Sequence, residues 1–226
     1  MNGPQFIRAR HGYFDGSNRP RWIVVHTMEY PKTLDAARWC ANYFATDVRK
    51  SAHYCIDAGT TIQSIQETDG AWHTPGFAAG LEVNRNSIGI EHAGYANQSP
   101  EAWSDSYNAA MLDRSADLVA DIANRHGIPV RRLSIDEIRA GTPGIAGHHD
   151  FTIATGVGSH TDPGFAFPWD SYLHRVNERG RSAISASRPR VSSLALVGLL
   201  LATAGAWALL YPNDARALAT RLRSTW

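Results

Sequence analysis

The chain has 226 residues, of which 43% are hydrophobic and 19% are charged. This composition excludes both an intrinsically disordered chain and a uniformly membrane-embedded one, and the length is sufficient for one domain with a sizeable core. The formal net charge of +1 gives no global positive field, so nucleic acid is not expected as a partner.

The first part of the chain carries the patterns of a buried strand and an amphipathic helix. Residues 21–28 (RWIVVHTM) form an apolar run that predicts a buried strand ending at His26. Residues 33–46 have apolar side chains at helical spacing, which predicts a helix with Thr33 as its N-cap. The apolar positions of this helix are Leu34, Ala37, Trp39, Cys40 and Phe44.

Short strand patterns follow in the middle of the chain. Residues 52–57 and 60–65 lie on either side of Ala58 and Gly59, and this arrangement predicts a β-hairpin. Residues 87–94 (SIGIEHAG) predict another short strand.

The clearest helical pattern covers residues 99–128, with Ser99 as the N-cap and an end near Gly127. Residues 145–151 (IAGHHDF) are expected to form a strand end or a loop, and residues 169–179 a last helix. Because strands alternate with helices, the sequence predicts an α/β fold in which a central mixed β-sheet is flanked by helices.

The chain contains two cysteines, Cys40 and Cys55, and both have apolar neighbours. We therefore expect two buried free thiols. A disulfide between them is the alternative if the domain reaches an oxidising compartment. Two cysteines cannot build a disulfide framework or a zinc knuckle.

The last part of the chain differs in composition from the rest. Residues 191–211 form a run of 21 residues without a charge, long enough to cross about 30 Å of hydrocarbon as a helix. Trp207 and Tyr211 suit a membrane interface. A buried core helix is the alternative, but core helices rarely lack a polar face over such a length. We therefore predict one C-terminal transmembrane helix.

These patterns divide the chain into a soluble domain and a membrane anchor. We expect the soluble domain at residues 1–176, a basic linker at 177–190, the transmembrane helix at 191–211 and a short tail at 212–226. Residues 1–14 have no apolar core of the kind found in secretory signal peptides, so no signal peptide is expected.

Three short segments carry histidines and a carboxylate that suit a metal site. His26 ends the first strand, and His148 and His149 are adjacent in GHHDF. His160 and Asp162 lie in SHTDPG, where Asp-Pro-Gly favours a turn. Two imidazoles and one carboxylate make a three-ligand catalytic zinc site with a fourth position for water. Zinc lowers the pKa of that water towards ~7 and polarises a carbonyl, which suits hydrolysis.

Six motifs along the chain carry a resemblance to a known family. In chain order they are IVVHT, SAHYCIDAGTTIQ, AWHTPG, NSIGIEHAG, GHHDFT and HTDPGFAFPW. With these motifs, residues 20–170 resemble the zinc-dependent N-acetylmuramoyl-L-alanine amidases of type 2, which share their fold with peptidoglycan recognition proteins. The resemblance implies a central mixed sheet flanked by helices, with a zinc site in a groove on one face.

The resemblance also implies which residues hold the metal. The implied ligands are His26, His148 and Asp162, with the Pro163–Gly164 turn directing the carboxylate. The residues alone leave His149 open as an alternative to His148, because adjacent loop residues can exchange roles. The GHxD pattern of the family favours His148.

Two further residues are implied to take part in catalysis. Glu91 stands where many family members carry a glutamate that moves a proton between water and the departing amine. His160 stands where related amidases often carry a lysine that stabilises the oxyanion, and an imidazole can donate the same hydrogen bond. Ala52 replaces the catalytic tyrosine of other members, so the glutamate version of the mechanism is expected here.

The resemblance implies that the chain hydrolyses the amide bond between N-acetylmuramic acid and L-alanine in peptidoglycan, with Zn2+ as cofactor and a monomeric catalytic domain. The alternative is a non-catalytic peptidoglycan-binding module on the same fold. Four arginines at positions 179–190 precede the predicted span and three follow it, which favours a cytoplasmic N-terminal side. This arrangement suits a phage or prophage endolysin that is held at the membrane until it is released to the cell wall.

Overall fold

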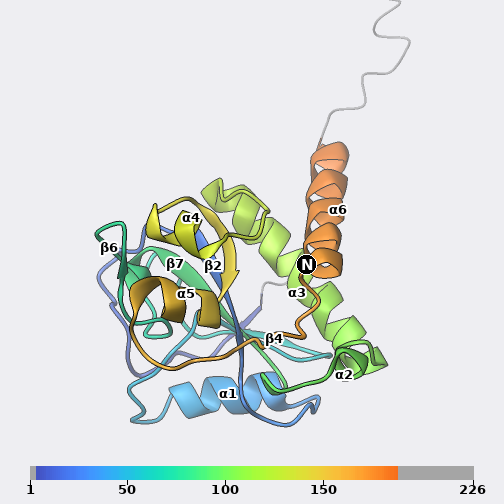
Figure 1. Ribbon diagram of the computed structural model, residues 1–226. Helices are drawn as coiled ribbons and strands as arrows, with labels where there is room; N and C mark the ends of the chain where they lie inside the picture. Colours follow the sequence, from blue (N-terminus) through green and yellow to red (C-terminus); the bar gives the residue numbers. More distant parts are fainter. Residues whose placement is uncertain (1–3, 188–226) are drawn as a thin grey trace, which may run out of the picture. The chain divides into compact units, whose positions relative to one another are not determined.

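The computed structural model describes residues 4–187 (Figure 1). The predicted transmembrane helix at 191–211 and the tail at 212–226 lie outside these residues. Within 4–187, no helix is both long and apolar enough to cross a membrane.

A mixed sheet of six strands, in the order β1-β4-β3-β7-β2-β8, forms the centre of the fold. Its strands are β1 (Gln5–Phe6), β2 (Trp22–Thr27), β3 (Tyr54–Ile56), β4 (Thr61–Gln63), β7 (Ser87–His92) and β8 (Gly144–Gly147). All neighbours are parallel except β3 and β4, which form the predicted antiparallel hairpin. A separate small hairpin consists of β5 (Phe77–Ala78) and β6 (Leu81–Glu82), and a 3-10 turn at Val83–Arg85 follows it.

The helices cover both faces of this sheet, which confirms the predicted mixed sheet flanked by helices (Figure 1). They are α1 (Ala36–Phe44), α2 (Pro100–Trp103), α3 (Ser106–His126), α4 (Ile135–Arg139), α5 (His148–Thr155) and α6 (Trp169–Ser187). Helix α6 continues through part of the predicted linker at 177–190. The domain boundary at residue 176 stays a prediction.

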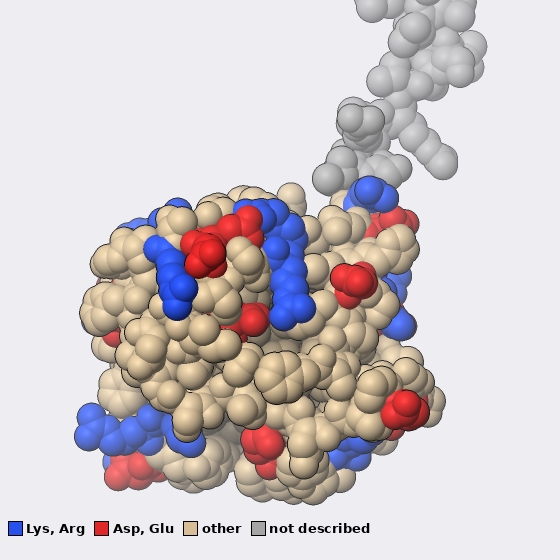
Figure 2. Space-filling view, in the orientation of Figure 1, with Lys and Arg blue, Asp and Glu red and all other residues tan. Residues whose placement is uncertain are grey.

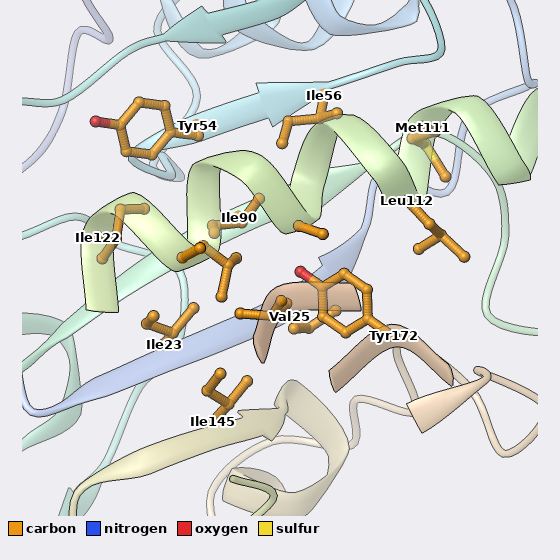
Figure 3. Packing of buried hydrophobic residues seen from close by; sticks show 14 of the residues in the cluster. Ile23, Val25, Tyr54, Ile56, Ile90, Met111, Leu112, Ile122, Ile145 and Tyr172 are labelled. Atoms are coloured by element: carbon orange, nitrogen blue, oxygen red, sulfur yellow. The ribbon is translucent and has the colours of Figure 1, made fainter. Parts of the chain in front are cut away.

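One face of the sheet packs against α3 and α6. Ile23 and Val25 of β2 point to this face because alternate strand residues project to opposite sides. They belong to one cluster with Met111 of α3 and Tyr172 of α6, and all four side chains are fully buried (Figure 3). This cluster is the largest part of the core.

The opposite face is covered at two separate places. At one end, Cys40 and Phe44 of α1 pack on β3 and β4, while at the other end Phe151 of α5 packs on Trp22 of β2. His26 and Glu91 are register partners on β2 and β7, so their side chains project to the same face of the sheet. The carboxyl ends of these two strands open into a groove on this face.

Helix α1 differs from its sequence prediction in its start and in its buried face. It begins at Ala36, and the residue at its N-cap is Asp35 rather than Thr33. Leu34 is 65% exposed and Trp39 40% exposed, although both were expected on the apolar face. Ala37, Cys40 and Phe44 are buried as predicted, and Ala36 and Ala41 are buried with them. Cys40 and Cys55 are buried free cysteines.

The single helix predicted at 99–128 is two helices. Ser99 caps α2 by accepting a hydrogen bond from the Ala102 amide, but α2 ends at Trp103. The side chain of Asp105 then accepts a hydrogen bond from the Asn108 amide and starts α3, so a second cap interrupts the pattern. The predicted end near Gly127 is confirmed, since this residue is left-handed with φ 65°.

Candidate active site

A groove of about 640 Å³ lies over the carboxyl ends of β2 and β7. Residues from α1, from segments 49–51 and 72–75, and from the start of α5 form its walls. The groove contains all the site residues expected from the sequence, namely His26, Glu91, His148, His160 and Asp162. Figure 2 shows basic and acidic side chains interspersed on one face of the molecule.

Three buried side chains from three elements meet in this groove. His26 lies near the end of β2, His148 is the first residue of α5, and Asp162 lies in the loop after α5. His26 Nδ1 is 3.0 Å from Asp162 Oδ2, and His148 Nδ1 is 3.3 Å from Asp162 Oδ1. One potential ligand atom from each residue lies within 4.8 Å of the other two.

The turn after Asp162 is held tightly against a neighbouring loop. Gly164 has φ +91°, a conformation that side chains other than glycine rarely adopt. A Cβ atom at this position would lie 1.8 Å from the carbonyl oxygen of Ala96. The Asp162 carbonyl also accepts a hydrogen bond of 2.8 Å from the His149 amide. The Asp-Pro-Gly turn therefore fixes the position of the Asp162 carboxylate relative to α5.

The structure brings His148, rather than His149, to the cluster. The sequence predicted a strand end or loop at 145–151, but α5 begins at His148 directly after β8, and Gly147 donates a hydrogen bond of 2.9 Å to Asp150. Successive residues in the first turn of a helix point in different directions. His149 instead approaches the carbonyl of His160 with Nδ1 at 3.0 Å and packs edge-on against Phe165.

His160 lies beside the cluster, at the more exposed side of the groove. Its ring stacks on His148 with a centroid separation of 3.9 Å, and its Nδ1 is 3.7 Å from Asp162 Oδ1. Burial, together with the nearby His148, lowers the pKa of His160. The ring remains about half exposed, so it can reach a molecule bound in the groove.

Glu91 presents a carboxyl group to the groove from β7. Although part of the residue is exposed to the groove, its Oε2 atom is buried and has no hydrogen-bond partner among the described residues. Burial and the negative charge of Asp162 raise the pKa of Glu91 well above its usual value. A carboxyl group in such surroundings can both accept and donate a proton.

His73 is more closely tied to the cluster than the sequence indicated. His26 Nε2 lies 2.9 Å from His73 Nδ1, and burial holds the pKa of His73 well below its usual value. His73 lies in AWHTPG, one of the six motifs that carry the resemblance. Ser87, which contacts His73, was not predicted. Strand alternation could have identified Ser87, because Ser87, Gly89 and Glu91 lie on the same face of β7.

Most of the chain matches a known protein family. Residues 16–165 match the model of a family described as N-acetylmuramoyl-L-alanine amidase. No curated protein matches the chain.

Several solved structures share the fold at low sequence identity. The hydrolase AmiA of Staphylococcus aureus, solved with its ligand, is 18% identical, with a TM-score of 0.58 over 82% of this chain and 87% of that one. The catalytic domain of XlyA is 20% identical, with a TM-score of 0.52 over 77% of this chain and 99% of that one. AmpD is 22% identical, with a TM-score of 0.51 over 79% of this chain and 95% of that one.

Proposed function

The chain belongs to the N-acetylmuramoyl-L-alanine amidase family, and from this premise we propose that it is a zinc-dependent enzyme that cleaves the amide bond between N-acetylmuramic acid and L-alanine in peptidoglycan. The observation that carries the proposal is the buried cluster of His26, His148 and Asp162 at the base of a groove that also contains Glu91. The cluster can hold a metal, and the groove can hold the substrate beside it.

The donor atoms in this cluster fit zinc. Two imidazoles and one carboxylate from three elements are typical of catalytic zinc sites, which keep a fourth position open. The Nδ1 atoms of His26 and His148 both face the Asp162 carboxylate. Burial holds the pKa of His26 at about 4, so this imidazole is neutral as a ligand must be. Zinc bound there supplies a Lewis acid that activates water and polarises the amide carbonyl.

We assign the proton transfer to Glu91. Its carboxyl group lies on the same face of the sheet as His26, one strand away, and its Oε2 atom has no partner in the described part of the chain. From this position Glu91 takes the proton of the attacking water and returns it to the amine of the departing L-alanine. A positioned acid–base group of this kind contributes roughly 10²–10⁴-fold to the rate.

We assign His160 to the carbonyl oxygen of the scissile amide. Its ring is stacked on His148 and is open to the groove, so an N–H of the imidazole can donate a hydrogen bond to the oxygen as negative charge develops. Stacking on a buried side chain restricts the ring and keeps this donor in place.

A membrane location is proposed from sequence alone. Residues 191–211, outside the described residues, form the uncharged run predicted to anchor the chain, and the arginine distribution favours a catalytic domain that stays in the cytoplasm until release. Peptidoglycan lies beyond the inner membrane, so such an enzyme acts on the wall only after the membrane is breached. An endolysin that is retained in the cytoplasm until the membrane is breached would behave in this way.

The metal centre is tested by measuring the zinc content of the purified full chain and of four variants. We expect about one zinc ion per chain in the unaltered protein. His26→Ala, His148→Ala and Asp162→Ala should each lose most of it. His149→Ala is the matched control, because His149 contacts Phe165 and the His160 carbonyl instead of the cluster, and it should keep its zinc. Zinc lost from His149→Ala but kept in His148→Ala would overturn the assignment.

A further inference from the structure

Two exposed aromatic side chains of α1 line the groove. Trp39 was predicted on the buried face of this helix, but it is 40% exposed, and Tyr43 is 39% exposed. The two residues are four positions apart, so they lie on the same face of the helix. Both belong to the wall of the groove that contains the His26, His148 and Asp162 cluster. Large aromatic side chains that stay exposed in a groove indicate a surface that binds a ligand.

The rings are held nearly parallel by a third aromatic residue. Tyr30, in the loop after β2, stacks on Trp39 with a centroid separation of 3.8 Å and an angle of 13° between the ring planes. The Trp39 and Tyr43 rings are 5.5 Å apart with an angle of 3°. The backbone of Tyr30 is fixed in turn, because it exchanges hydrogen bonds of 3.3 and 2.9 Å with Gly94. Tyr30, Trp39 and Tyr43, the aromatic row, are therefore ordered before a ligand binds, which reduces the entropy lost on binding.

The polar atoms of the two groove residues are free for a ligand. Other tyrosine hydroxyl groups of the domain form hydrogen bonds within the protein, namely those of Tyr13, Tyr54, Tyr107 and Tyr172. In contrast, the exposed Trp39 indole N–H and Tyr43 hydroxyl form no hydrogen bond with another residue of the described part of the chain. The aromatic row thus combines flat apolar faces with a donor and a hydroxyl at their edges.

A sugar ring matches this combination. The C–H groups of a pyranose give it an apolar face that packs on an aromatic ring, while its hydroxyl and acetamido groups lie around the rim. An indole N–H and a phenol hydroxyl can form hydrogen bonds with such groups. The three side chains carry no charge, which suits an uncharged saccharide better than the carboxylates of a peptide. The cations of the groove, Arg49 and Lys50, come from the separate segment 49–51.

We propose that Trp39 and Tyr43 form a saccharide subsite that binds a sugar ring of the glycan strand, and that Tyr30 is a positioning residue that fixes the Trp39 ring. The inference rests on the proposed function, because N-acetylmuramic acid is the sugar attached to the amide that the enzyme is proposed to cleave. The subsite makes the enzyme prefer substrates that carry their sugars over free peptides. Loss of the Trp39 ring should weaken saccharide binding by about 10-fold, the scale of one aromatic contact.

The first test compares two substrates that contain the same amide bond. One is a disaccharide of N-acetylglucosamine and N-acetylmuramic acid with its stem peptide, and the other is the same peptide with only a D-lactoyl group in place of the sugars. For the full chain in detergent, Trp39→Ala should raise KM for the disaccharide substrate about 10-fold with kcat unchanged. The kcat/KM for the lactoyl peptide should stay the same, and Trp39→Tyr, which keeps a ring on Tyr30, should retain most of the affinity.

Leu34→Ala is the matched control. Leu34 lies just before α1 and is 65% exposed, but it does not line the groove. This variant removes an exposed apolar side chain from the same region and should behave like the unaltered chain with both substrates.

The second test measures saccharide binding without cleavage. The probe is the uncharged tetramer of β-1,4-linked N-acetylglucosamine, which has no bond to L-alanine, and its binding to the full chain is followed by isothermal titration calorimetry. The unaltered chain and Leu34→Ala should bind the tetramer equally. Trp39→Ala should bind it about 10-fold more weakly.

The outcomes separate this inference from the proposed function. A tetramer that binds Trp39→Ala as tightly as the unaltered chain, or that binds neither, would overturn the saccharide subsite. An equal loss of kcat/KM on both substrates would also overturn it, because Trp39 would then act on the peptide or on the fold. If the unaltered chain cleaves neither substrate, the proposed amidase function is wrong, whereas calorimetry still decides whether the aromatic row binds a saccharide.

Discussion

At the scale of single residues, the site combines side chains that are far apart in sequence. His26, His148 and Asp162 were predicted as a cluster from motifs that resemble a known family, and the structure brings the three together. The choice between His148 and His149 could not be made from the residues alone. It depends on the start of α5, because the first residue of that helix, His148, lies against His26 of β2, whereas His149 approaches the His160 carbonyl. The hydrogen bond between Ser87 and His73 was not predicted, because the two motifs that contain these residues do not indicate which of their side chains are in contact.

The role of Glu91 gives a prediction at this scale. Glu91→Gln keeps the shape of the side chain but removes its ability to exchange a proton. We expect the variant to bind zinc normally and to lose roughly 10²–10⁴-fold in turnover on peptidoglycan. Parallel measurements of zinc content and of the rate of amide cleavage distinguish this outcome from loss of the metal. Full activity in Glu91→Gln would remove Glu91 from the mechanism.

At the scale of elements, sequence patterns identified the strands that carry the site. β2 and β7 are buried segments, and their apolar residues form clear strand patterns. The prediction of one continuous helix at 99–128 was wrong. The side chain of Asp105 caps a new helix, although the apolar residues continue at helical spacing across this point. Helix α4 was not predicted, since it has only five residues, and its one signal is the capping box between Ser134 and Glu137.

The end of α3 gives a prediction of pH-dependent stability. The Glu67 carboxylate accepts hydrogen bonds from Tyr54 at 2.7 Å and from Arg125 at 2.6 Å, and it contacts His126 at 2.7 Å. Burial alone would raise the pKa of Glu67, but these partners lower it from 4.5 to about 2. The contacts therefore stabilise the fold fully above the ordinary pKa, and this contribution is lost as the pH falls from about 4.5 to about 2.

Glu67→Gln should accordingly lower the free energy of unfolding at pH 7 by on the order of 1 kcal/mol. The difference from the unaltered protein should shrink steadily below pH 4.5 and be nearly absent at pH 2. Urea denaturation at a series of pH values measures both quantities. A difference that stays constant down to pH 2 would show that charge on Glu67 does not stabilise the fold.

At the scale of the whole molecule, the fold explains the position of the groove. α3 and α6 cover one face of the sheet, while α1 and α5 cover separate ends of the other face. The ends of β2 and β7 thus carry the cluster at the base of an open groove. The alternation of strands and helices predicted the layers, but it could not predict this gap, which depends on how α1 and α5 pack.

The predicted anchor at 191–211 gives a prediction about the location of the full chain. The full chain should sediment with membranes and require detergent for extraction, because the uncharged run is long enough to span the hydrocarbon core. A chain without residues 188–226 retains every proposed site residue and should remain in solution and cleave isolated cell walls. Recovery of the full chain without detergent would exclude a transmembrane helix at 191–211.

The most direct test of the central claim is to identify which bond the enzyme breaks. Purified peptidoglycan is digested with the full chain in detergent, and the products are analysed by mass spectrometry together with assays for new amino groups and new reducing sugars. The proposed chemistry predicts stem peptides that begin with a free L-alanine amine, with no increase in reducing ends. New reducing ends without free L-alanine amines would identify cleavage of the glycan and would contradict the proposed roles of the cluster and of Glu91.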